Sequence, residues 1–107
     1  MATGRLATTT TAAANTNATV YTVPTGFYAV ANVSFTNTNA TSVTVRLAMA
    51  STATPAANEY IEYDTVIVGK GVFERTGLVL NAGLNLVAQA SQTAVNINVY
   101  GIETSTS

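Results

Sequence analysis

Few side chains in this sequence could take part in acid–base or nucleophilic chemistry. It contains no histidine and no cysteine, so the commonest general base, a thiol nucleophile and the usual zinc ligands are missing. Two of the five carboxylates, Glu62 and Asp64, lie two residues apart and would project from one face of a strand. Such a pair could act in glycoside hydrolysis or bind Ca²⁺, but a solvated strand face with Arg75 as an ion partner is the favoured interpretation. We therefore expect that the protein is not an enzyme and that it has no catalytic residue, cofactor or metal ligand.

The tyrosines are the other side chains that could recognise a ligand. Tyrosine rings on the surface of a sandwich can stack on sugars or anchor protein contacts. The sequence has no tryptophan and its tyrosines are scattered, which favours packing in the core and at its rim over sugar binding. The five are Tyr21, Tyr28, Tyr60, Tyr63 and Tyr100.

The elements that must position these side chains are strands. Residues 27–51 contain two runs in which apolar and polar residues alternate, with the turn-forming residues 37–41 between them. Because successive strand side chains point to opposite sides, each run has one apolar face. Such a pair of strands needs a second layer to cover that face. The predicted core residues are Phe27, Val33, Phe35, Val45, Leu47, Leu86, Ile97 and Val99.

Turn-forming residues divide the rest of the chain into further short alternating segments. The turns lie at residues 24–26, 69–71 and 81–83. Gly77, inside the run of residues 72–80, indicates a bulge or a change of sheet. No segment shows the period of a helix. The pattern predicts an all-β fold, an antiparallel β-sandwich of seven or eight strands that is immunoglobulin-like or jelly-roll-like, spanning residues 18–103.

The composition favours a chain that works within an assembly. Of the 107 residues, 48% are hydrophobic and 8% are charged, against roughly 25% charged in ordinary soluble proteins. Like-charge repulsion, which keeps small proteins apart, is weak on such a surface. The formal net charge of −1 provides no basic field for nucleic acid or anionic lipid, and no apolar run approaches the ~20 residues of a membrane helix. We expect a homo-oligomer that binds neither nucleic acid nor membrane.

The two ends of the chain are predicted to lie outside the sandwich. Residues 1–17 are rich in threonine and alanine and form the expected N-terminal arm, and residues 104–107 form a polar tail. The arm has too few large apolar side chains to bury itself, but its threonines suit extended backbone that can add to the sheet edge of a neighbour. The predicted assembly residues are Arg5, Leu6, Thr8, Thr9, Thr10 and Thr11.

Several stretches resemble small virion proteins of tailed bacteriophages. These are EYIEYD at 59–64, GVFERTG at 71–77, LNAG at 80–83 and the alternating VNINVYGIE at 95–103. The resemblance covers roughly residues 20–103 and implies a virion structural protein without catalytic residues, assembled in the host cytoplasm. A capsid decoration or cement protein that binds the major capsid protein or other virion subunits is the favoured role. A receptor- or glycan-binding module of a phage tail or fibre is the alternative.

Overall fold

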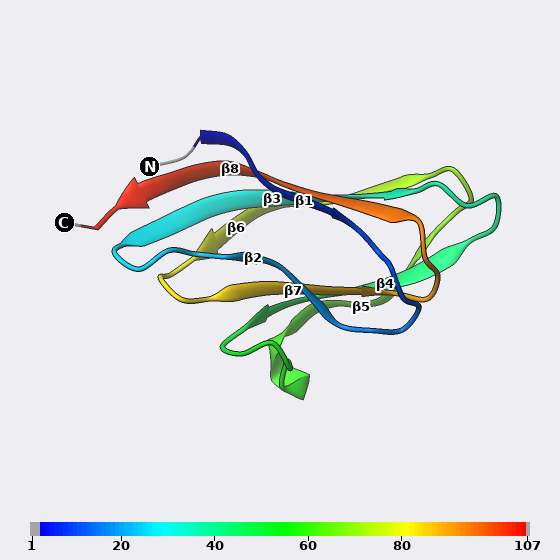
Figure 1. Cartoon of the computed structure of the whole chain (residues 1–107), viewed down its shortest axis with the longest axis horizontal. Coiled ribbons are helices and arrows are strands. Elements are labelled where there is room, and N and C mark those ends of the chain that lie inside the picture. The colour runs from blue at the N-terminus through cyan, green and yellow to red at the C-terminus, as the bar shows by residue number, and fades with distance from the viewer. Residues whose placement is uncertain (1–2, 107) are drawn as a thin grey trace.

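The computed structural model describes residues 3–106, which fold into two stacked antiparallel sheets of four strands each (Figure 1). Sheet A has the order β1-β8-β3-β6, and sheet B has the order β2-β7-β4-β5. The predicted all-β sandwich is confirmed. Its elements are β1 (Thr3–Thr10), β2 (Ala18–Thr22), β3 (Phe27–Asn37), β4 (Val43–Ala50), the short 3₁₀ helix η1 (Ala57–Glu59), β5 (Tyr60–Ile67), β6 (Val72–Leu80), β7 (Asn85–Ala90) and β8 (Val95–Ser105).

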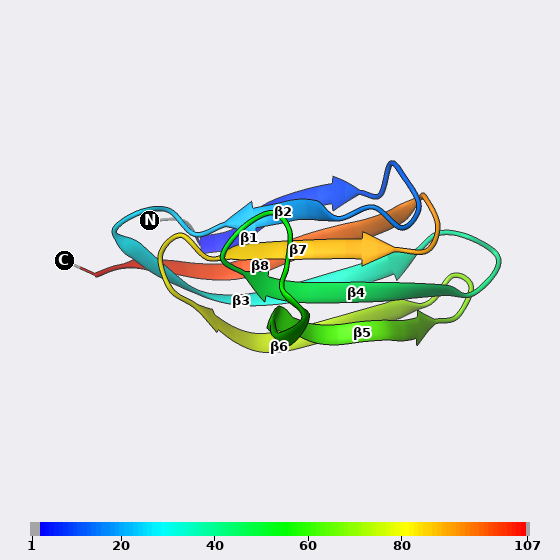
Figure 2. The same ribbon diagram turned by 90° about the horizontal axis from the view of Figure 1, so that it is seen from below.

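The pairing of the strands identifies the sandwich as a jelly roll. Strands β4 and β5 pair, and around them β3 pairs with β6, β2 with β7 and β1 with β8. These nested pairs are those of one long hairpin that is rolled up. The ladder between β3 and β8 joins two of these pairs into sheet A, and the ladder between β4 and β7 joins the other two into sheet B (Figure 2). Of the two sandwich types that the sequence left open, the jelly roll is the one formed.

The core lies between the sheets and is built from the alternating positions of both. In β3 every second residue from Ala29 to Asn37 is buried, and β8 repeats this pattern from Val95 to Val99. Seven of the eight predicted core residues are buried, and Phe27 is half-buried and packs against them. The period of two therefore assigned the inward faces correctly.

Irregularities in the ladders include bulges beside Gly77 and at Asp64. Gly77 has a φ of +71°, and the pairing of β3 with β6 shifts between Ala31 and Val33. The Gly77 N–H donates to Asn32 Oδ1 at 3.0 Å. Of the bulge and the change of sheet that the sequence left open at Gly77, the bulge is the one formed. In β5, Asp64 has a φ of +56° and the pairing with β4 shifts after Val45. The alternating sequence gives no sign of this bulge in β5.

The ends of the chain differ from the sequence prediction. Residues 3–10, expected in an arm outside the sandwich, form edge strand β1 along β8, and β8 continues through residues 104 and 105 of the expected tail. Main-chain bonds place the first strand, and Leu6 and Ala7 pack against the core. The prediction of an arm outside the sandwich rested on the small number of large apolar side chains in this segment. An open sheet edge, however, orders a strand through main-chain hydrogen bonds. Met1, Ala2 and Ser107 lie outside the described residues.

The Asn37 side chain forms hydrogen bonds to the backbone of the turns at one end of the sandwich. It is fully buried, and its amide group donates to the carbonyl oxygens of Thr41 at 2.9 Å and Val68 at 3.0 Å. Its Oδ1 accepts the backbone N–H of Asn39 at 2.9 Å. These bonds join the β3–β4 connection to the end of β5 and satisfy a polar group that would otherwise be costly to bury.

Candidate interaction surfaces

The structure separates the two carboxylates that the sequence placed on one strand face. Glu62 accepts a hydrogen bond from Arg75 Nη1 at 2.7 Å, and this ion pair links β5 of sheet B to β6 of sheet A. Asp64 pairs with Arg46 on β4. The bulge at Asp64 causes the separation, because its positive φ breaks the alternation between the two residues. The expected Glu62–Arg75 pair is present, and the two carboxylates are held by different arginines.

Asp64 belongs to an exposed cluster on the outer side of sheet B. Arg46 donates to both carboxylate oxygens of Asp64, at 2.6 and 3.2 Å, and its guanidinium carbon lies 4.0 Å from the Tyr63 ring centroid. Tyr60 meets the Tyr63 ring edge-on, with 5.2 Å between the ring centroids. Tyr63 is 60% exposed. The cluster thus presents an aromatic ring beside a fixed ion pair.

The ion pair of Arg46 and Asp64 makes a pH-dependent contribution to the stability of the fold. The hydrogen bond from Arg46 holds the pKa of Asp64 below its ordinary value. The unfolded chain therefore takes up the proton first as the pH falls, so stability from this pair is present above pH ~4 and is lost at lower pH. We expect Asp64→Asn to reduce the fall in urea midpoint between pH 7 and pH 3. Arg46→Gln should reduce it equally, since it removes the same bond. An unchanged fall in both variants would contradict this assignment.

A buried pair of polar side chains connects the two sheets. Tyr21 on β2 donates through its hydroxyl to Glu103 Oε2 on β8 at 2.5 Å, and both residues are buried. Burial and then the bond to Glu103 raise the pKa of Tyr21 far above its ordinary value. The hydroxyl therefore stays protonated and donating. Sequence reasoning missed this pair, although Glu103 follows Val99 and Gly101 in the inward positions of β8.

The predicted assembly residues do not share one face of β1. Arg5, Thr8 and Thr10 point outward from sheet A, because their partners on β8 do so. Leu6 lies at a shift in the β1–β8 pairing and packs against the core. Thr9 and Thr11, the remaining two, line a cavity at the end of the sandwich, which Thr10 also borders.

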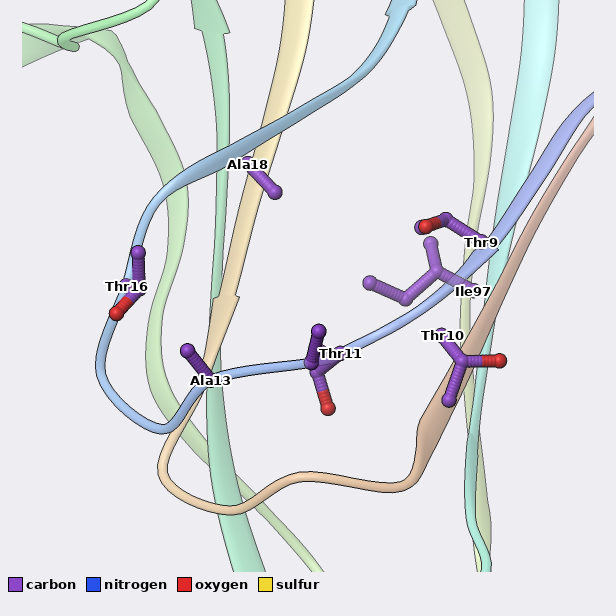
Figure 3. Close-up of a pocket in the computed structure, with 8 residues that line it drawn as sticks. Thr9, Thr10, Thr11, Ala13, Thr16, Ala18 and Ile97 are labelled. Carbon is purple, nitrogen blue, oxygen red and sulfur yellow. The ribbon is translucent and has the colours of Figure 1, made fainter.

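This cavity has a volume of about 200 Å³ and lies between the end of β1, the connection to β2 and the start of β2 (Figure 3). Ile97 points into it from β8, and Ala13, Thr16 and Ala18 close the other side. The residues that line it are threonines, alanines and one isoleucine, and none of them is charged. It has room for a small apolar group and offers no acid–base chemistry.

The outer face of sheet A, called the A face below, is almost free of charge. An apolar row crosses it, because Val30 is the register partner of both Val79 on β6 and Ile102 on β8. Val79 is 64% exposed and Ile102 is 46% exposed. Tyr28 extends the row along β3. The outward side chains that form the A face are Thr3, Arg5, Thr8, Thr10, Tyr28, Val30, Asn32, Ser34, Thr36, Val72, Glu74, Val79, Asn96, Asn98, Tyr100, Ile102 and Thr104.

The two charges of the A face lie near opposite edges. Arg5 is on β1, and Glu74 is on β6 at the other side of the sheet. The Tyr100 hydroxyl donates to Glu74. Within residues 3–106, Arg5 has no ion-pair partner. The apolar row and this placement of charge follow from strand order, so sequence reasoning missed them.

Comparisons with known proteins found no matching family model, and searches of curated proteins and of solved structures found no significant match. Among residues 3–106, no helix is long and apolar enough to cross a membrane. In the same part of the chain, no three acidic side chains gather where they could hold a metal ion.

Proposed function

We propose that the chain is a non-enzymatic structural protein of a tailed-phage virion, a capsid decoration or cement protein that stabilises the shell. The observation that supports this role best is the free edge of β1. Among the described strands, β1 has β8 as its hydrogen-bonded neighbour on one side and ends sheet A on the other. Edge strands are usually protected by charges or proline, whereas Thr8, Thr9 and Thr10 carry neither. Such an edge can pair with a strand of another virion subunit.

The proposed partner is the major capsid protein or another virion subunit. A few main-chain hydrogen bonds of about 0.5–1.5 kcal/mol each make one contact weak. Many copies on one shell hold firmly, because each is tethered close to its next contact. The low charge of the chain suits this role, since little repulsion opposes close packing of the copies. The role requires neither nucleic acid nor membrane and places the protein in the virion, assembled in the host cytoplasm.

Thr10→Pro tests the free edge directly. The Thr11 N–H donates to Val95 on β8 at 2.9 Å, so by strand alternation the Thr10 N–H points to the free edge. Proline removes that donor without removing a main-chain bond to β8, although the hydroxyl bond from Thr10 to Asn96 is lost. We expect fewer copies of Thr10→Pro than of the unchanged chain on purified particles. Thr10→Ala is the matched control, because it loses the same hydroxyl and keeps the N–H. Equal loading of Thr10→Pro and Thr10→Ala would contradict the proposal.

The cluster of Tyr60, Tyr63, Arg46 and Asp64 favours a second function, binding of a receptor glycan by a tail or fibre module. An exposed tyrosine ring can stack on a sugar, and a fixed ion pair can bond to its hydroxyls. A glycan array would test this, with Tyr28→Ala as the control for Tyr63→Ala. Micromolar binding that is lost in Tyr63→Ala alone would place this function ahead of capsid decoration. Absence of binding by the unchanged chain would exclude it for the glycans on the array.

A further inference from the structure

The A face has the composition of a surface that is buried in a protein–protein contact. Its exposed apolar row costs free energy in water, and contiguous apolar patches on small proteins often mark contacts. The remaining side chains are mostly threonine, serine and asparagine, which can bond across an interface. Burying this face would leave two charges to be matched, those of Arg5 and Glu74.

The strand order makes the A face complementary to itself. We propose that two copies of the chain pack through their A faces about a two-fold axis that runs parallel to the strands. The order β1-β8-β3-β6 then places β8 against β3 of the partner subunit and β1 against β6 of the partner subunit. Ile102 consequently faces Val30 of the partner subunit, because the two residues share one level of the sheet. Val30 faces Ile102 of the partner subunit in the same way, whereas Val79 at the sheet edge faces Thr3 of the partner subunit.

The same axis also matches the two charges. It carries the β1 edge of one copy over the β6 edge of the other, so Arg5 approaches Glu74 of the partner subunit, and the reverse contact forms by symmetry. Arg5 is level with Tyr100, whereas Glu74 is level with Asn98, two residues along β8. This offset of about 7 Å is within reach of long side chains. An axis across the strands at the level of the apolar row would stack that row on itself and leave both charges unmatched.

The area of the face is that of a stable interface. The strands of sheet A have 8 to 11 residues, which at about 3.4 Å each gives lengths of about 27–37 Å. Four strands at about 4.8 Å give a width of about 19 Å, so the face covers roughly 500–700 Å². A standard interface buries about 800 Å² on each partner. The resulting dimer has four stacked sheets, and it forms without any capsid subunit.

Sedimentation equilibrium on the purified full chain tests the dimer. We expect a dimer of the unchanged chain at micromolar concentration and a monomer for Ile102→Asp, which places a charge in the apolar row. Val66→Asp is the matched control, because Val66 is 64% exposed and lies on β5 of the other sheet. This variant should remain dimeric. A monomeric unchanged chain, or a loss of dimer in Val66→Asp alone, would overturn the proposal.

A charge exchange tests the axis. Arg5→Glu and Glu74→Arg should each weaken dimerisation about tenfold or more, since each places like charges together. The double variant should recover most of the loss. Failure of the double variant to recover, with the melting temperature unchanged, would show that the axis is wrong. Dimerisation is measured on the purified chain without capsid protein, so a failed dimer and a failed capsid contact give different results.

Discussion

Replacing Gly101 with alanine is expected to lower the free energy of unfolding by about 3 kcal/mol or more. Gly101 lies in β8 against the central strand β3 and has a φ of +153°. A Cβ at this position would lie 2.0 Å from the Val30 carbonyl oxygen and 2.9 Å from the Ala31 Cα. Both are backbone atoms of a strand held between two neighbours, so neither can turn aside as a flexible side chain could.

Gly83→Ala is the matched control for this substitution. Gly83 has a φ of +81°, and nothing lies within 4 Å of its added Cβ. Alanine at residue 83 introduces the backbone strain of a positive φ but no clash of its Cβ, so it should lower the free energy of unfolding by about 1–2 kcal/mol. Urea unfolding of both variants measures the difference. Equal losses would show that strain alone, and not the close approach of β8 to β3, accounts for the need for glycine at residue 101.

Phe35→Ala should cost about 3–5 kcal/mol, because it leaves a large cavity in the core. Phe35 is fully buried in β3. Its register partners are Ile97 on β8 and Phe73 on β6, and the Phe73 ring centroid lies 6.1 Å from its own. Strands β3 and β8 are held on both sides by ladders, so they cannot collapse into the space. A typical domain has only about 5–15 kcal/mol of stability in total, so this variant should be marginally folded.

Val79→Ala is the control for Phe35→Ala. Val79 also belongs to sheet A but is 64% exposed, so its truncation should change stability by at most about 0.5 kcal/mol in the monomer. The urea midpoint at a concentration below dimerisation gives the comparison. A loss below about 1 kcal/mol for Phe35→Ala would mean that the inward face of β3 is assigned wrongly.

Most strands and their inward faces could be predicted from the sequence, because alternation is a local property. In residues 27–37 and 95–99 successive side chains point to opposite faces of the strand, and this holds whatever the rest of the chain does. The turns were equally local, as at Gly26 and Gly83, where a positive φ requires glycine. The shortage of chemistry-bearing residues, with neither histidine nor cysteine, is likewise a property of composition and requires no fold.

Only the tertiary structure decided which strands lie side by side. The jelly roll, the order of sheet A and the ordering of residues 3–10 along β8 depend on main-chain bonds between distant segments, and these bonds are nearly independent of side-chain type. The bulge at Asp64 likewise separated it from Glu62, which local alternation had placed beside it. The pair of Tyr21 and Glu103 and the apolar row of the A face join residues far apart in the chain. No local pattern contains such pairs, because they exist only once strand order and register are set.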